Sequence, residues 1–295
     1  MKGIQRRSVG YCLYGVALTL ALLYYRFPSE ASRDFISAKI SGLRPGIHVS
    51  LREVSLSLKF GVEFKGMKIV QETQPPSPVL ELERVFIRPA VWSILRGQLE
   101  GCFEGSLYDG SVKGCAALKD GSAGEPFSTT VTLEGIRLDP ENPIVKVTGR
   151  DVQGILGGEV TYRGRPGFLA GGRGEAELRL KAGRIALLRP ILGLESIDFN
   201  EIRLRATLND RKIRLANLDL RGQQMHGTLS GQVSLNRDFL RSALDLAGSL
   251  EPYSDMFKDL KTSQEFMRSI KKQLKGGRLP FVIKGTIGEP VIRFL

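Results

Sequence analysis

Apolar and polar residues alternate with a period of two along most of the sequence after residue 46. Over residues 53–60 the even positions are apolar and the odd positions are polar. The longest such run covers 202–208, turns at 209–211 and returns over 213–220. Because successive side chains of a strand point to opposite faces, this pattern predicts strands with one apolar and one polar face.

The same alternation recurs at short, regular intervals. The other segments that share it are Leu80/Leu82, Val131/Leu133, Val145/Val147, Leu178/Leu180, 229–235, 244–250 and 281–287. Glycine accounts for 34 of the 295 residues without a three-residue period, which indicates many turns. We therefore expect a mainly β chain, with a curved antiparallel sheet or meander and few short capping helices.

A sheet with one apolar face raises the question of what covers that face. Closure into a barrel or stacking of two layers would bury it within the chain. The alternative is an open, curved trough that exposes the face to lipid chains. The alternation is compatible with both arrangements.

The N-terminal segment 9–25 contains seventeen residues without a charge and follows Lys2, Arg6 and Arg7. At 1.5 Å per residue it would span about 25 Å, the short end of what a bilayer core accepts. We expect a cytoplasmic tail over 1–8, a transmembrane anchor over 9–25 and a periplasmic remainder. A cleaved signal peptide, with a small-residue site at Ser29–Ala31, and a buried core helix are the alternatives.

The rest of the chain divides into four predicted regions. They are an amphipathic linker helix over 28–44, a periplasmic β domain over 46–250, an amphipathic basic helix over 251–278 and C-terminal strands over 279–295. Two short apolar stretches, 90–95 and 186–192, are predicted to be single helical caps over the sheet. The basic end of the 251–278 helix could either contact a membrane or lie solvated along the sheet.

The segment Leu107–Val112 predicts a hairpin with Asp109-Gly110 as its two-residue turn. This register places Cys102 opposite Ala117, diagonal to Cys115 and about 7–8 Å from it, near or past the limit for a disulfide. Oxidising surroundings or a β-bulge would favour the bond, so the pairing stays open. Cys12 lies inside the apolar N-terminal segment.

The search for catalytic residues is mostly negative. Ser230 lies in a Gly-Thr-Leu-Ser-Gly segment that resembles a nucleophile elbow only superficially, because the serine is in the fourth place. His226 could in principle serve Ser230, but a surface or turn histidine is the simpler interpretation. The same holds for His48, and two histidines nearly exclude a multi-histidine metal site.

Phosphate-binding and carboxylate motifs are equally weak. Gly171–Gly174 lacks the later glycine and the strand-to-helix context of a dinucleotide loop. Glu81 and Glu83 share a strand face, as solvated carboxylates commonly do. The net charge of +12 is dispersed without interleaved aromatic residues, which argues against nucleic acid as a partner. We expect no enzyme activity and no catalytic, cofactor-binding or metal-binding residues.

A family resemblance adds to this interpretation. The segments that carry it, in order, are Gly46–Leu58, Phe64–Ile69, Leu80–Ile87, Ala90–Gly97, Gly101–Gly114 and Gly285–Phe294. With the basic N-terminus and single anchor, they resemble the AsmA-like periplasmic β architecture. Within that group, the length and the ending are similar to the type II secretion system protein N (GspN) family. The resemblance implies an inner-membrane accessory of type II secretion in a Gram-negative envelope, without catalytic residues.

Three functional hypotheses follow. The leading one is a single-pass inner-membrane component of type II secretion that binds other inner-membrane or pseudopilus components through sheet edges or the polar face. The second is lipid transport or envelope-lipid homeostasis through an apolar trough, which would depend on residues such as Leu204 and Leu215. The third, a periplasmic hydrolase, has only Ser230 as a candidate.

Overall fold

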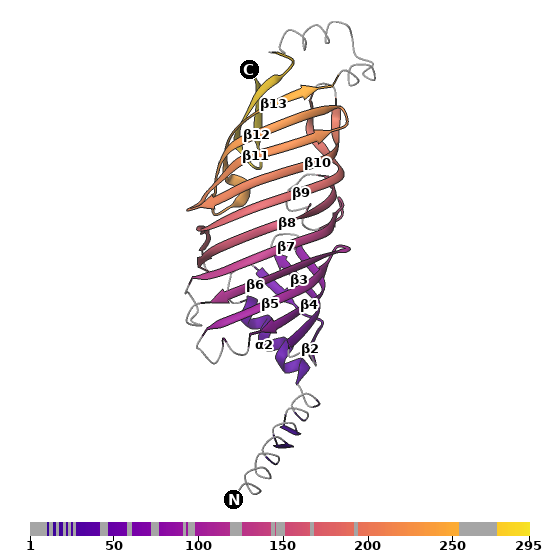
Figure 1. The fold of residues 1–295 in the computed structure, drawn as a ribbon, viewed down its shortest axis with the longest axis vertical. Coiled ribbons are helices and arrows are strands. Elements are labelled where there is room, and N and C mark those ends of the chain that lie inside the picture. The colour runs from indigo at the N-terminus through magenta and orange to yellow at the C-terminus, as the bar shows by residue number, and fades with distance from the viewer. Residues whose placement is uncertain are drawn as a thin grey trace, which may run out of the picture.

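The computed structural model describes residues 11, 14, 15, 18, 19, 22, 25, 28–41, 47–57, 61–71, 77–90, 93, 98–118, 126–142, 145, 151–165, 168–191, 194–253 and 276–295. These residues form one antiparallel sheet of fifteen strands. Its strands follow chain order from β3 to β15, β1 pairs with β3, and β2 also pairs with β3. Figure 1 shows the strands stacked one above another along the long axis of the molecule. The mainly β, antiparallel fold predicted from the alternation is confirmed.

The strands are short at the N-terminal end of the sheet and longest in its middle. Their bounds are β1 (Ile47–Ser50), β2 (Glu53–Ser57), β3 (Gly61–Gln71), β4 (Ser77–Pro89), β5 (Leu99–Leu107), β6 (Gly110–Leu118), β7 (Phe127–Leu138), β8 (Val152–Arg165), β9 (Phe168–Ile191), β10 (Leu194–Asn209), β11 (Lys212–Gly222), β12 (Met225–Ser234), β13 (Ala243–Pro252), β14 (Leu279–Thr286) and β15 (Pro290–Phe294).

Two helical elements accompany the sheet. Helix α2 (Ser29–Ser41) lies against β1 and β2, where its Ile36 packs on the apolar side chains of the first strands (Figure 1). The 3-10 helix η1 (Phe239–Arg241) follows β12 and is capped by Asp238, whose carboxylate accepts a hydrogen bond from the Leu240 N–H. Helix α2 lies inside the range 28–44 given by the sequence pattern.

Several local expectations were wrong. The stretch 186–192 is not a helical cap, because β9 continues to Ile191 and pairs there with β10. Val145 is helical and not part of a strand, and it packs beside Leu107 and Ile136. A short apolar run is compatible with either a strand end or a helix. The secondary structure of these two segments therefore depends on their tertiary contacts.

Other predictions fall on residues that are not described. Among the described residues, none of the helices is both long enough and apolar enough to span a bilayer. Most of the predicted anchor over 9–25 and the central part of the predicted helix over 251–278 lie outside the described residues. At the two ends of the latter range, β13 continues to Pro252 and Gly276-Gly277 form a turn before β14.

The hairpin between β5 and β6 turns one residue earlier than predicted. Tyr108 and Asp109 form the turn with φ angles of 45° and 62°, and Gly110 already pairs with Leu107. Two positive φ values are typical of the type I′ turn that joins twisted antiparallel strands. A Cβ atom on Gly110 would lie 2.6 Å from the backbone of Gly135, so the glycine is needed for close approach to β7.

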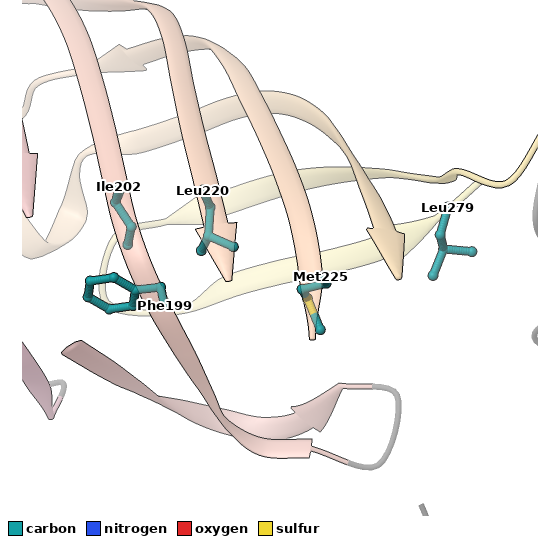
Figure 2. Close-up of a cluster of buried hydrophobic side chains, with 5 residues drawn as sticks. All are labelled: Phe199, Ile202, Leu220, Met225 and Leu279. Atoms are coloured by element: carbon teal, nitrogen blue, oxygen red, sulfur yellow. The ribbon is translucent and has the colours of Figure 1, made fainter. Parts of the chain in front are cut away.

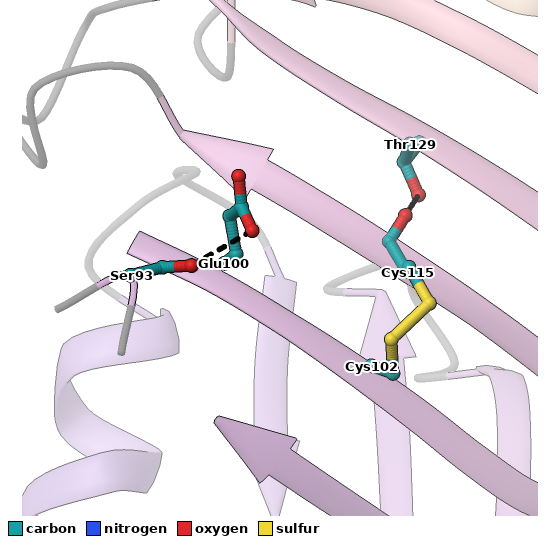
Figure 3. The surroundings of a disulfide bond; sticks show 5 residues. All are labelled: Ser93, Glu100, Cys102, Cys115 and Thr129. Carbon is teal, nitrogen blue, oxygen red and sulfur yellow. Dashed lines mark hydrogen bonds between the residues drawn. A yellow bond between two sulfur atoms is a disulfide. The ribbon is translucent and has the colours of Figure 1, made fainter. Parts of the chain in front are cut away.

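This shift changes which residues face each other. Cys102 lies directly opposite Cys115, and the two form a disulfide on the polar side of the hairpin (Figure 3). The Thr129 hydroxyl on β7 donates a 3.0 Å hydrogen bond to the Cys115 carbonyl. The predicted diagonal arrangement, with Cys102 opposite Ala117, is therefore wrong.

Candidate functional site

The apolar side chains of the alternating strands point to the same face of the sheet, which we call the apolar face. On β9 and β10 this face carries the cross-strand pairs Leu178↔Leu204 and Leu180↔Ile202. The opposite, polar face carries the pairs Arg179↔Arg203 and Glu177↔Arg205. The strand registers thus place apolar residues opposite apolar residues and polar residues opposite polar residues. The alternation within each strand therefore becomes two continuous faces of the whole sheet.

Buried side chains gather on the apolar face in three clusters. The N-terminal cluster comprises Val49, Leu51, Val54, Phe64 and Val85. The central cluster comprises Leu107, Ile136, Leu138 and Val145. The C-terminal cluster comprises Phe199, Ile202, Leu220, Met225 and Leu279. The residues of the last set come from β10, β11, β12 and β14, and Figure 2 shows all five side chains.

Two leucines join these clusters into one continuous apolar strip. Leu82 packs against both the N-terminal and the central cluster. Leu180 packs against both the central and the C-terminal cluster, and it lies between Leu156 on β8 and Ile202 on β10. Because adjacent strands are about 4.8 Å apart, the strip extends about 60 Å along the sheet.

Within the described part of the chain, α2 packs on the N-terminal cluster and Val145 packs in the central cluster, and no further described element forms a second layer. The described strands make their main contacts with their immediate sheet neighbours. Strands β1 and β15 are the two ends of the strand order, and they do not pair with each other. The closed barrel and the two-layer sandwich, both left open by the sequence, are thus not formed by the described residues.

Part of the apolar face keeps some contact with solvent. Much of the apolar face away from the cluster cores is only half-buried, including Leu178, Leu204, Leu208, Ile213 and Leu215.

The polar face is organised by ion pairs between neighbouring strands. Lys68 Nζ lies 3.1 Å from Glu81 Oε1, and Lys113 Nζ lies 3.5 Å from Glu134 Oε2. The hydrogen bond and positive charge of Arg205 hold the pKa of Glu177 below its ordinary value. These exposed pairs keep the face solvated and contribute little stability individually.

A hollow of about 910 Å³ lies on the polar face over β7 to β11. Glu159, Glu177, Arg179 and Arg205 are among its lining residues, together with small residues such as Gly157. Most of these charges already belong to ion pairs within the sheet. The hollow therefore has the chemistry of a solvated surface.

The structure separates the two residues considered for hydrolysis. His226 and Ser230 share the polar face of β12 but are four residues apart, which is about 13 Å along a strand. His226 instead places its Nε2 2.6 Å from Asp219 Oδ1, and that hydrogen bond lowers the pKa of the Asp219 carboxyl. Sequence reasoning missed this pair, because its members lie on different strands.

The remaining candidates lie apart from one another. His48 is exposed on β1, Glu83 is exposed on β4, and Glu81 pairs with Lys68. Gly171–Gly174 lies within strand β9, without the strand-to-helix turn that a dinucleotide loop needs. In the described ranges, no three His, Cys, Asp or Glu side chains are grouped as metal ligands would be.

Comparison with family models, with curated proteins and with solved structures finds no match for this chain.

Proposed function

We propose that this chain is a non-enzymatic envelope protein that shelters lipid acyl chains along its apolar face. The observation that carries the proposal is the apolar face of the sheet, where Leu178, Leu204, Leu208, Ile213 and Leu215 stay half-buried beside the buried clusters and no described element forms a second layer over them. The role fits the AsmA-like resemblance of the sequence, within lipid transport or envelope-lipid homeostasis.

The physical argument concerns what an uncovered apolar face requires. Burying apolar surface away from water is favourable by a free energy of about 25 cal/mol per Å². Contiguous apolar patches beyond a few hundred Å² on a soluble surface mark sites for a ligand, a partner or a membrane. Acyl chains are flexible and uniformly apolar, so they match a long strip without polar anchors.

The proposed location follows from the sequence alone. A basic N-terminus followed by the uncharged segment 9–25 would hold the protein in the inner membrane, with the sheet in the periplasm. The disulfide between Cys102 and Cys115 is compatible with that oxidising compartment.

Lipid binding is tested by extracting the purified full chain and identifying bound phospholipid by mass spectrometry. Leu204→Asp and Leu215→Asp place a charge on the apolar face and are expected to remove most of the bound lipid. Thr207→Asp, on the polar face of β10, is the matched control and should leave it in place. Lipid-free wild-type protein, or equal lipid content in all variants, would refute the proposal.

A role in type II secretion is the second candidate, and the edge strand β15 favours it. Among the described strands β15 pairs with β14 alone, and its Val291, Ile292 and Phe294 are 48%, 41% and 39% exposed. A free strand edge with apolar side chains can pair with a strand of another secretion component.

Secretion assays test this second candidate. Deleting the protein should reduce secretion of folded periplasmic substrates, and Ile292→Pro should have the same effect because proline disrupts edge pairing. Substituting a residue on the interior strand β12, as in Thr228→Val, is the control. Normal secretion after deletion would exclude this role.

A further inference from the structure

The strand ends opposite the C-terminal cluster form a continuous rim of turns. We call this the turn rim and define it as the described residues of 163–173, 209–212, 235–242 and 286–290. Its segments are joined by backbone hydrogen bonds. The Arg211 N–H donates to the Ala170 carbonyl at 2.7 Å, the Leu235 N–H to the Arg211 carbonyl at 2.7 Å, and the Gly288 N–H to the Leu240 carbonyl at 2.9 Å. Turns far apart in sequence therefore form one surface (Figure 1).

The turn rim exposes three large apolar side chains. Leu169 is 49% exposed, Phe239 50% and Leu240 45%. The last two lie on η1, whose backbone is held by the Asp238 cap and by the contact with Gly288. A single exposed leucine needs no explanation, but Phe239 and Leu240 are adjacent on η1 and Leu169 lies on another turn of the same rim.

The turn rim also carries an excess of positive charge. The turn rim contains seven basic residues and three acidic residues. The basic side chains, all exposed, are Arg163, Arg165, Arg173, Arg211, Lys212, Arg237 and Arg241. The acidic ones are Asp210, Asp238 and Glu289, of which Asp238 pairs with Arg241 at 3.3 Å.

We propose that the turn rim docks on the surface of a bilayer rich in anionic phospholipid. Leu169, Phe239 and Leu240 would enter the headgroup region, and the surrounding arginines and lysine would face lipid phosphates. Nucleic acid would account for the charges alone. A bilayer surface accounts for both the charges and the exposed apolar side chains, and it is the partner that matches the proposed lipid function.

This inference deepens the proposed lipid function and rests on it for its purpose. Docking by the turn rim would bring the half-buried part of the apolar face, at Leu208 and Ile213, next to the membrane. Lipid occupancy of the strip and contact of the rim with a bilayer are nevertheless separate measurements.

A fluorescent reporter on the rim tests the docking in the full chain. Leu240→Cys, in a Cys12→Ser background, is labelled with an environment-sensitive dye, and the protein is reconstituted into vesicles that contain a headgroup-region nitroxide lipid. We expect quenching in vesicles of phosphatidylcholine with phosphatidylglycerol and much weaker quenching in phosphatidylcholine alone. Ile155→Cys, exposed on the polar face, is the matched reporter and should stay unquenched in both.

Charge variants test the electrostatic part. Each basic residue near an anionic surface strengthens partitioning about fivefold. Arg165→Gln, Arg173→Gln and Lys212→Gln together should therefore reduce the rim-bound fraction at least about tenfold. Neutralising Lys181, Arg278 and Arg293, which lie away from the turn rim, is the control and should leave quenching unchanged.

Each outcome bears on the proposal. An unquenched Leu240 reporter, equal quenching in neutral and anionic vesicles, or displacement of the rim by a short DNA duplex would overturn it. Quenching at Leu240 without bound lipid on the strip would refute the proposed lipid function and leave rim docking in place. Bound lipid without quenching at Leu240 would refute docking by the turn rim and leave the proposed lipid function in place.

Discussion

The imidazole Nε2 of His226 lies 2.6 Å from the Oδ1 of Asp219, across the β11–β12 pair on the polar face. Arg221 lies on the other side of the same carboxylate, at 3.0 Å from Oδ2. The two hydrogen bonds favour the ionised carboxylate, so the pKa of Asp219 is lowered, chiefly by His226. The pair thus couples stability to pH.

Asp219→Asn should make this coupling visible. The stabilisation by a carboxylate with a lowered pKa is present above the pKa of an unfolded aspartate, about 4, and is lost as the pH falls through the folded-state pKa. We expect the variant to lose about 1–2 kcal/mol of unfolding free energy at pH 7. The difference from wild type should shrink as the pH falls through the lowered pKa of Asp219 in the folded state.

Urea unfolding at several pH values measures the effect. Asp245→Asn removes a polar-face carboxylate on β13 that makes no ion pair with described residues, and it serves as the control. A constant difference between Asp219→Asn and wild type over pH 3 to 7 would contradict the assignment.

The disulfide fixes how many free thiols the protein should have before and after reduction. With Cys102 and Cys115 bridged, denatured protein should take up one alkyl group, at Cys12, and three after reduction. The closed loop is short, with a sequence separation of 13, so loss of the bond should cost at most about 3 kcal/mol. Intact-mass measurement before and after reduction checks the pairing. Three groups without reduction would show that the bond is absent.

Gly110→Ala should destabilise the β5–β6–β7 region. Its Cβ would lie 2.6 Å from the backbone carbon of Gly135 and from the Ile136 nitrogen, where backbone and not a flexible side chain must move. We expect a loss of about 2 kcal/mol or more, seen in thermal unfolding. Gly101→Ala on the same hairpin, with its nearest atom at 3.4 Å, is the control. Equal stability of the two variants would contradict the close approach.

Leu180→Ala tests whether the apolar strip is continuous. Because Leu180 packs on two clusters, its truncation should cost about 2 kcal/mol and increase amide exchange on both sides of β9. Leu178→Ala changes the same face of the same strand outside these clusters and should cost less. Exchange confined to one cluster would show that the strip is divided at this point.

The sequence predicted the faces of this fold better than its connections. The alternation through Ile202–Leu208 identified which side chains share a face, since strand geometry has a fixed period of two. The sequence misplaced the turn of the β5–β6 hairpin. Gly110 is required by its close approach to the backbone of Gly135, which lies twenty-five residues later on another strand. The pair of Asp219 and His226 was missed for the same reason.

What the sequence determined by itself is local: strands with one apolar and one polar side, a helix within residues 28–44, and an uncharged N-terminal segment. Only the tertiary structure decided that Cys102 meets Cys115, that Leu82 and Leu180 join three clusters into one strip, and that the described residues leave that strip without a second layer. The physical reason is that periodicity specifies the direction in which a side chain points. What lies in that direction depends on registers and close approaches between strands, which no local pattern encodes.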